Sequence, residues 1–320
     1  MFPFKKWLKA AFVLGAYLAF GMQNGLASSP SPVALGAVHT VATFDASLSE
    51  FPEGLAIDKQ GNIYAALTLT GNVWKMTAEG EQSILTHLDV GSSGGFLVGL
   101  AIDAMGNVYV CDDTFESGTH GIWKVERNGE AELFASLDPT GFPNAMAFDK
   151  DGNLFVTDSA LGKIYKISSS GEVTVWLKDP LLAPITAFGA NGMEFDRGDL
   201  WVANTDQGTI VRIKICEDGR PRATVFVQSP ALVGADGIAF DERRGLYVAV
   251  DIQNTLVHIS PDRRITTLVT ASDGLDYPAS TSFGQTPGQR RFLFWTNGGI
   301  NFGTPSIQKV DVGIPGVPLP

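Results

Sequence analysis

Short apolar segments alternate with polar turns along nearly the whole chain, and their order repeats. Five times, an apolar strand is followed by a tight turn rich in Gly, Asn and Asp and then by a second apolar strand. Gly, Asn and Asp tolerate the positive φ angles that tight hairpin turns require, so each copy predicts a β-hairpin. The copies read “GLAID-KQGN-IYAAL”, “GLAID-AMGN-VYVCD”, “AMAFD-KDGN-LFVTD”, “GMEFD-RGD-LWVAN” and “GIAFD-ERRG-LYVAV”, and a sixth, degenerate copy reads “STSFGQTPGQRRFLFWT”.

Further strands follow each hairpin. The third strand reads “NVWKM”, “GIWKV”, “KIYKI”, “TIVRI”, “TLVHI” and “SIQKV” in successive copies, and the first five copies add a fourth, such as “QSILTHL”. Four strands in a repeat of this length are typical of a β-propeller blade. We therefore predict an all-β, six-bladed propeller over residues 38–320. The residues that precede the six first strands are spaced by 45, 46, 47, 45 and 43 positions: Glu53, Val98, Asn144, Asn191, Asp236 and Ala279.

The sixth unit lacks a fourth strand of its own. A segment with the pattern of a fourth strand, “HTVATFDA”, occurs near the other end of the chain, at residues 39–46. We expect this segment to complete the last blade and to close the ring, because closure removes two exposed strand edges.

Four of the six residues that precede the first strands carry a side-chain oxygen. They are Glu53, Asn144, Asn191 and Asp236, whereas the second and sixth blades have Val98 and Ala279 there. In a propeller the innermost strand of each blade starts near the central axis, so these side chains are expected to converge at the mouth of the tunnel. Asn and Asp also begin strands as turn caps. A general turn requirement would apply to all six blades, however, whereas a metal ion needs only some of them.

The expected cluster has the chemistry of a calcium site. Two carboxylates and two amides, without His or Cys, form a cage of hard oxygen ligands. Such a cage suits Ca²⁺ better than Zn²⁺, and other divalent cations stay open. Two negative charges also balance one dication, whereas without a cation one carboxylate would have to take up a proton.

The charge of the chain limits the classes of partner. The formal net charge is −11, and Lys and Arg do not cluster after the first ten residues. Phosphate binding needs a basic footprint, so a nucleic-acid partner is not expected, and docking on anionic lipid is disfavoured. We expect a small-molecule substrate, and nothing in the sequence indicates an oligomeric state.

The N-terminus resembles a secretory signal. Three lysines precede a 13-residue apolar run, “AAFVLGAYLAFGM”, and “GLA” at residues 25–27 supplies small residues for cleavage. The run is shorter than the ~20 residues of a spanning helix. We therefore predict a signal peptide over residues 1–27, a disordered leader over 28–37, and a secreted or periplasmic protein with no membrane segment after cleavage. Cys111 and Cys216 are expected in distant blades, as two free thiols.

The hub motif resembles a known family. Glu-Gly in the first blade, Asn in the third, Asn-Gly in the fourth and Asp-Gly in the fifth, within “GADGIAFD”, are similar to the senescence-marker-protein/gluconolactonase family and to the related diisopropylfluorophosphatases and paraoxonases. The resemblance covers nearly the whole chain after residue 37. It implies that Glu53, Asn144, Asn191 and Asp236 hold one catalytic Ca²⁺ on the tunnel axis.

The chain also departs from this family pattern. Where the fluorophosphatases hold a second, structural calcium with an Asp and a His, this sequence has Ala239 and Ser282. A second metal at that place is therefore not expected. Neither Cys lies near a chain end, which excludes a paraoxonase-like disulfide.

The resemblance implies a calcium-dependent hydrolase of lactones or related esters. Ca²⁺ would polarise the carbonyl oxygen, and Asp236 would act as general base or as nucleophile. The loops after the second strands should form the rim of the site. Asp112, Asp158 and Asn204 are expected to support the metal ligands from these loops, and His120 is a further candidate.

Two other classes of protein stay open at this point. One is a strictosidine-synthase-like or lyase propeller, which uses the same scaffold without hydrolysis. The other is a non-catalytic binding propeller of the NHL type. Calcium on the axis distinguishes the hydrolase from the binding protein, because a binding propeller needs no such oxygen cage.

Overall fold

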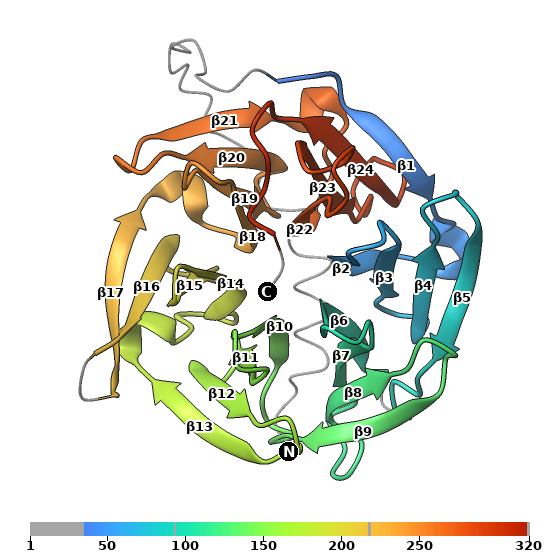
Figure 1. The fold of residues 1–320 in the computed structure, drawn as a ribbon, viewed down its shortest axis with the longest axis vertical. Helices are drawn as coiled ribbons and strands as arrows, with labels where there is room; N and C mark the ends of the chain where they lie inside the picture. The colour runs from blue at the N-terminus through green and yellow to red at the C-terminus, as the bar shows by residue number, and fades with distance from the viewer. Residues whose placement is uncertain (1–34, 93, 217–218, 319–320) are drawn as a thin grey trace. The chain divides into compact units, whose positions relative to one another are not determined.

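The predicted propeller is confirmed by a computed structural model, which describes residues 35–92, 94–216 and 219–318. Within these residues, six four-stranded antiparallel sheets surround a central axis, with the inner strands β2, β6, β10, β14, β18 and β22 nearest to it (Figure 1). The predicted signal peptide lies outside the described residues, and no helix within them is long and apolar enough to cross a membrane.

The strands follow the predicted order within each blade. The first five blades are β2 Pro52–Ile57, β3 Ile63–Leu67, β4 Asn72–Met76 and β5 Gln82–His87; β6 Phe96–Ile102, β7 Val108–Asp113, β8 Gly121–Val125 and β9 Ala131–Ser136; β10 Pro143–Phe148, β11 Leu154–Asp158, β12 Lys163–Ile167 and β13 Val173–Lys178; β14 Ala190–Asp196, β15 Asp199–Asn204, β16 Thr209–Ile215 and β17 Pro221–Gln228; and β18 Ala235–Phe240, β19 Leu246–Val250, β20 Thr255–Ile259 and β21 Ile265–Val269. Short 3-10 helices lie at Ala46–Leu48, Pro180–Leu182, Pro230–Leu232 and Ala271–Asp273.

The sixth blade is closed by the other end of the chain, as predicted. It consists of β22 Pro278–Phe283, β23 Phe292–Asn297, β24 Ser306–Asp311 and, as its outermost strand, β1 His39–Thr43. β1 runs antiparallel to β24, and Phe44 just beyond it is 8% exposed in a core cluster with Trp74. Both cysteines are free, so the ring is closed by strand pairing and packing alone.

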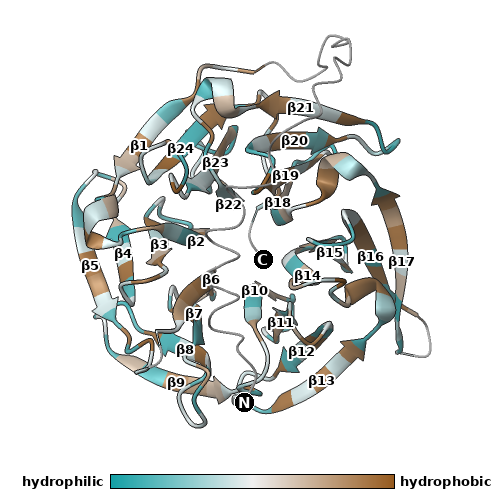
Figure 2. Ribbon diagram, turned by 180° about the vertical axis from the view of Figure 1, so that it is seen from behind, coloured by the Kyte–Doolittle hydropathy of each residue, from teal (hydrophilic) through white to brown (hydrophobic). Residues whose placement is uncertain are grey.

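The core lies between successive blades. Aromatic side chains of the second strands meet aromatic side chains of the next inner strand at steep angles. Trp201, for example, packs on Phe240 with ring centroids 5.2 Å apart, and Phe155 packs on Phe195 at 5.1 Å. Figure 2 shows the apolar residues repeating along the strands of every blade. Each blade therefore buries its apolar faces against its two neighbours, which fixes the inner strands around the axis.

The inner strands line a tunnel with two ends. We call the end where these strands begin the hub, and the opposite end, where residues 313–318 cross the inner strands, the tail face. At the tail face the amide of Val317 donates to the carbonyl of Phe240, at the end of β18. A ring of one side chain per blade separates a small hub cavity from a larger tail-face cavity: Leu55, Leu100, Met146, Met193, Ile238 and Thr281.

Candidate metal centre

A bulge at the start of every inner strand sets the direction of the hub side chains. In each blade the pairing of the first and second strands shifts register across the hub residue. In the fourth blade the shift falls between Ala190 and Met193, so Asn191 and Gly192 lie inside the bulge. The fifth blade has the same shift between Ala235 and Ile238, around Asp236. A β-bulge bends the strand and re-aims a side chain, which brings four residues that are far apart in sequence to one axis.

The glycine that follows a hub residue lets adjacent blades approach closely. A methyl group added to Gly192 would lie under 3.0 Å from the backbone carbonyl of Asp236 in the next blade. Gly54, Gly99 and Gly237 face the hub carbonyls of their own neighbours in the same way. None of these four has a positive φ angle, so close approach and not backbone freedom explains the glycine. In this sequence motif, a residue whose side-chain oxygen can bind a metal is thus followed by a glycine that allows tight contact with the next blade.

We predict that Gly192→Ala destabilises the protein by about 1–3 kcal/mol, because the added methyl group overpacks the contact between the fourth and fifth blades. Chemical denaturation followed by tryptophan fluorescence measures this change. Gly288→Ala is the matched control, since no atom lies within 4 Å of its added methyl group. Equal losses of unfolding free energy in the two variants would show that the contact between the fourth and fifth blades at the hub is not tight.

The four predicted hub residues are buried or partly buried, and their oxygens are short of partners. Asn144, Asn191 and Asp236 are between 4% and 7% exposed. The side-chain nitrogen of Asn191 donates to Thr205 Oγ1 at 3.0 Å, which leaves its oxygen Oδ1 free for the hub. That Oδ1 atom and Glu53 Oε2 are buried without any hydrogen-bond partner. Buried polar atoms are rarely left in this state, so these oxygens are candidates for binding a ligand.

The carboxyl groups at the hub also repel one another. Burial, and then the charge of Asp251, raises the pKa of Glu53 to about 8. Burial raises the pKa of Asp236 well above its usual range, and the charges of Glu53 and Asp251 raise it further. The pKa of Asp251 itself is raised by burial to about 7. A cation would reverse these shifts, because it favours the charged form of each carboxyl group.

Three residues beside the hub escaped the sequence analysis. Asp251 directly follows β19, and its charge acts on both Glu53 and Asp236. Asp113, the equivalent residue of the second blade, is fully buried and has no hydrogen-bond partner on either carboxyl oxygen. Tyr277 hydrogen-bonds Asp251 through its side chain and has a φ angle of 58°. The sequence did contain a signal for the two carboxyl groups, because Asp113 and Asp251 occupy the same position of their blades, directly after Asp112 and Val250.

The rim residues that the sequence singled out divide into two kinds. Asp158 accepts hydrogen bonds from the amides of Phe142 and Leu161, and the side chain of Asn204 donates to the carbonyls of Leu181 and Ala183. The contacts to Phe142, Leu181 and Ala183 tie down the connection from the preceding blade, and the contact to Leu161 holds the turn after β11. For Asp158 and Asn204, the hydrogen bonds thus account for a structural role.

Asp112 occupies the equivalent position but lacks such contacts. Both of its carboxyl oxygens are buried without a partner, and burial together with the charge of Asp89 raises its pKa to about 8. The interacting charge comes from Asp89 and not from the hub residues. Asp112 is therefore less directly placed for metal support than Asp113.

His120 is fully buried and is not a solvated loop residue. Its Nδ1 lies 3.7 Å from Asp113 Oδ1, and its ring stacks on Phe115 with centroids 5.7 Å apart. Burial lowers its pKa to about 4, so the imidazole is neutral near pH 7. His120 thus stands behind Asp113, one step away from the hub ligands.

The glycine-rich loop after β23 is firmly held. Asp276 Oδ2 accepts hydrogen bonds from the amides of Asn301, Phe302 and Gly303 at 2.7–2.9 Å. The side chain of Asn301 donates to the other oxygen of Asp276 at 2.7 Å. A carboxylate that collects four hydrogen bonds anchors this loop, so it forms a fixed part of the rim.

The hub fits a cation that is bound by oxygen. Within the described residues, no group of three His, Cys, Asp or Glu side chains is placed to hold a metal alone. A metal at the hub would therefore need the amide oxygens of Asn144 and Asn191 as well as the carboxylates. The free Oδ1 of Asn191 and the free Oε2 of Glu53 match that requirement, and oxygen ligands of this kind suit Ca²⁺.

Comparison with known sequences gives one family match and one group of relatives. The N-terminal strictosidine synthase-like family matches residues 40–76. The lactonase drp35 of Staphylococcus aureus is 25% identical over 213 residues, which are 62% of this chain. The chain thus spans 63% of the length of this relative.

Comparison with solved structures gives the same fold. The calcium-binding protein regucalcin of Agrobacterium tumefaciens matches with a TM-score of 0.66 and 17% identity, over 89% of this chain and 97% of regucalcin. A gluconolactonase of Xanthomonas campestris matches with a TM-score of 0.61 and 18% identity, over 89% and 98% of the two chains. At these identities the likeness concerns the fold. Together with the similarity to the S. aureus lactonase, it confirms the resemblance of this chain to the senescence-marker-protein/gluconolactonase family.

Proposed function

We propose that this protein is a calcium-dependent hydrolase of lactones or related esters, with its active site at the hub. The observation that carries the proposal is the set of two carboxyl and two amide groups at the hub, with buried oxygens that have no partner. Similarity to a lactonase supports the reaction type, and likeness to a protein described as calcium-binding supports the metal.

The proposed ligands of the cation are Glu53, Asn144, Asn191 and Asp236. When bound, Ca²⁺ would supply Lewis acidity toward the substrate carbonyl oxygen and stabilise the negative charge that develops there. Thr205 holds the amide nitrogen of Asn191, so the Asn191 oxygen keeps its direction toward the axis. Glu53 mainly contributes charge, since its carboxyl group has few other partners.

Asp236 is the proposed general base or nucleophile. As a base, one of its carboxylate oxygens would take the proton of the attacking water. As a nucleophile, the same oxygen would bond to the carbonyl carbon while the ring C–O bond breaks and the leaving oxygen takes a proton from water. A second water would then hydrolyse the acyl–aspartate bond, which releases the hydroxy acid and restores Asp236. Asp251 lies close enough to Asp236 to shift the pKa of Asp236. The hydroxyl group of Tyr277 donates a hydrogen bond to Asp251. The Tyr277 hydroxyl stays protonated because burial and the nearby carboxylates raise its pKa, so it fixes Asp251 in place.

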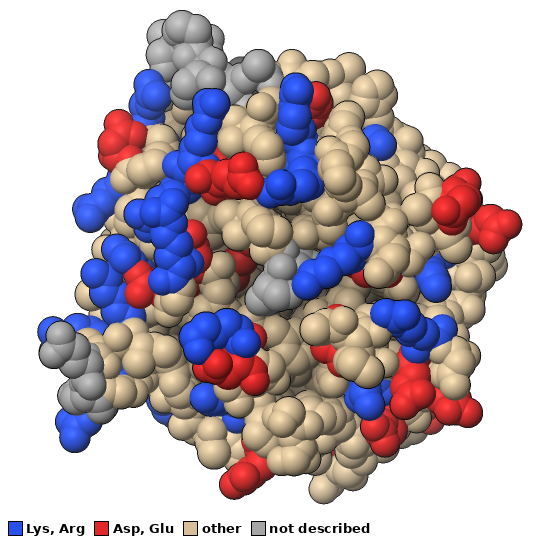
Figure 3. Space-filling model, in the orientation of Figure 1, with Lys and Arg blue, Asp and Glu red and all other residues tan. Residues whose placement is uncertain are grey.

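The charges of the molecule support a small-molecule substrate over nucleic acid. Figure 3 shows Lys and Arg side chains on one face, mixed with Asp and Glu. Several of these arginines are paired with acids: Arg244 Nε lies 3.1 Å from Asp196, and Arg291 Nη2 lies 3.0 Å from Asp311. Paired arginines do not form the free basic footprint that phosphate backbones need. We further propose export, on the signal-like N-terminus alone.

The match to the strictosidine synthase-like family favours a second candidate function. It covers residues 40–76, from β1 to β4, and includes Glu53. An enzyme of that kind would use the same scaffold without hydrolysing an ester. The two candidates differ in their product, because only lactone hydrolysis releases one proton per substrate at neutral pH.

Proton release from lactones tests the proposal. We expect a pH-stat to record hydrolysis of at least one sugar, alkyl or aryl lactone by protein with one bound Ca²⁺ per chain. Removal of the metal with a chelator should abolish the rate, and added Ca²⁺ should restore it. Aryl esters and phosphotriesters in the same assay define the substrate class. Hydrolysis that is indifferent to chelation would overturn the role of calcium, and a folded, metal-loaded protein without any hydrolysis would overturn the reaction.

A further inference from the structure

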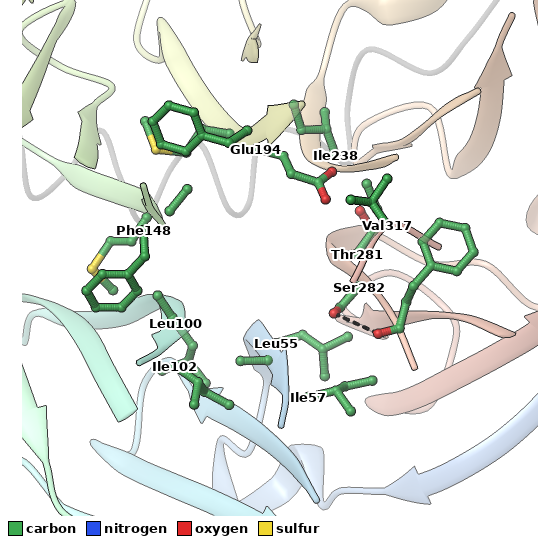
Figure 4. A pocket seen from close by; sticks show the side chains of 18 of the residues that line it. Leu55, Ile57, Leu100, Ile102, Phe148, Glu194, Ile238, Thr281, Ser282 and Val317 are labelled. Carbon is green, nitrogen blue, oxygen red and sulfur yellow. Dashed lines mark hydrogen bonds between the residues drawn. The ribbon is translucent and has the colours of Figure 1, made fainter. Parts of the chain in front are cut away.

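The tunnel contains a cavity at the tail face that is larger than the cavity at the hub. The tail-face cavity has a volume of about 160 Å³, and its walls are mainly the apolar side chains of the inner strands (Figure 4). Glu194 is the only ionisable residue among those that line it. A cavity lined mainly by apolar residues, with a few well-placed polar groups, is the usual form of a small-molecule site.

Glu194 breaks the pattern of its position in the other blades. The equivalent residues of the inner strands are small in every case: Ala56, Ala101, Ala147, Ala239 and Ser282. The repeat therefore needs only a methyl or hydroxymethyl group here, and the carboxyl group of Glu194 is not required by the fold. Placing it in an apolar cavity is unfavourable unless the group is paired.

The polar atoms of the cavity gather on one side. Figure 4 shows the Glu194 carboxyl group reaching from β14 toward Ile238, Thr281 and Val317. Glu194 Oε2 accepts a hydrogen bond from the amide of Phe240 at 2.6 Å. Thr281 Oγ1 is buried without any hydrogen-bond partner. A buried oxygen without a partner, on the side toward which the carboxyl group reaches, points to a ligand that donates hydrogen bonds in this part of the cavity.

The cavity is poorly suited to a metal ion. Ca²⁺ requires six to eight oxygens and Mg²⁺ a full octahedron, whereas this cavity offers one carboxyl group, two hydroxyls and the amide of Gln285 among apolar walls. An ammonium group needs only a few acceptors and can carry an apolar body. Its positive charge would also reverse the effect of burial, which raises the pKa of Glu194 to about 8.

We propose that the tail-face cavity is a second ligand site, which binds a small organic amine. The ammonium group would donate to the carboxylate of Glu194 and to Thr281 Oγ1, and the apolar body would fill the space between Leu55, Leu100 and Met146. The volume sets the size of the ligand, because an apolar cavity of about 150 Å³ holds one benzene molecule. The site is separated from the hub by the ring of residues that includes Thr281, so it does not depend on the proposed hydrolase function.

The tail forms part of the wall of this cavity. Val317 lines the cavity, and its amide donates to the carbonyl of Phe240 at 3.0 Å, while the amide of Phe240 donates to Glu194. Phe240 therefore links the cavity carboxyl group directly to the tail. Gly316 lies against the ring of Phe283, where an added methyl group would clash, so the tail is seated closely.

Benzylamine is a suitable probe, and benzyl alcohol is its neutral counterpart of similar shape. Isothermal titration of the protein at pH 8 should show benzylamine binding in the range of about 1 mM or tighter. Glu194→Ala, which installs the residue of four other blades, should weaken benzylamine binding at least tenfold and leave benzyl alcohol binding unchanged. Glu194→Gln should behave like Glu194→Ala, because it keeps the shape but not the charge. Asp236→Ala should bind benzylamine as the wild type does, since it alters only the hub.

Three results would overturn the proposal. The first is the absence of benzylamine binding at about 10 mM to the folded wild-type protein. The second is equal binding of benzylamine by the wild type and Glu194→Ala, which would mean an apolar cavity without charge recognition. The third is loss of benzylamine binding in Asp236→Ala, which would place the amine at the hub.

Discussion

Asp236→Ala is expected to lower kcat/KM for lactone hydrolysis by roughly 10³-fold or more, and to remove the bound calcium. The physical reason is that Asp236 is assigned two tasks, since it is both a charged ligand and the group that acts on water. Loss of a single stabilising donor in an active site already costs about 10²–10³-fold in rate. Metal analysis of the dialysed protein and pH-stat rates on the same sample measure both effects.

The stability of this variant separates loss of chemistry from loss of fold. In the presence of a chelator, Asp236→Ala should be at least as stable as the wild type, because it removes a buried carboxyl group that Glu53 and Asp251 repel. Asp151→Ala is the matched control, since the side chain of Asp151 is 64% exposed. It lies in the turn after β10, at the end of that strand opposite the hub. The control should keep full activity and metal content. A calcium-free Asp236→Ala protein that still hydrolyses lactones at the wild-type rate would refute the assignment.

Phe44→Ala is expected to cost about 3–4 kcal/mol of stability and to lower Tm by roughly 10 °C. Phe44 follows the closing strand β1, and its amide donates to the carbonyl of Pro305 in the sixth blade at 2.8 Å. Its ring meets Trp74 of the first blade edge-on, with centroids 5.2 Å apart and an interplanar angle of 79°. The residue thus fastens the segment that carries β1 to both the sixth and the first blade, next to the β1–β24 pairing that closes the ring without a covalent bond. Calorimetry and urea unfolding give the two values.

Phe302→Ala is the control for the same substitution, because Phe302 is 62% exposed on the rim loop. Its unfolding free energy should stay within about 0.5 kcal/mol of the wild type. If Phe44→Ala were equally mild, the closing strand would contribute little, and the other five blade interfaces would have to hold the ring.

The repeat made most of the fold predictable. Strands and turns recur in the same order in each blade, so a strand that is unclear in one copy can be assigned from the equivalent segment of another copy. Even the closing strand was visible, because the sixth blade lacks a fourth strand and the pattern reappears at residues 39–46. The predicted hub residues were found in the same way, since the structure places each of them in the same bulge. That they bind calcium stays a prediction.

The parts that escaped the sequence share one property: they depend on contacts between blades. Asp251 and Tyr277 lie in different loops and become neighbours only when the fifth and sixth blades pack. Asp112 and Asp113 are adjacent in sequence, yet only the second interacts with the charge of Glu53. Glu194 stands out only when the equivalent alanines are known to line one cavity.

The sequence by itself determined the number of blades, the closing strand and the oxygen-bearing residue at the start of four inner strands, because all three follow from periodicity along the chain. Only the tertiary structure decided which oxygens have no partner and which carboxyl groups repel one another. It also decided where the tunnel widens into a cavity around Glu194. These properties arise from burial and from distances between side chains of different blades, and no local pattern along the sequence encodes them.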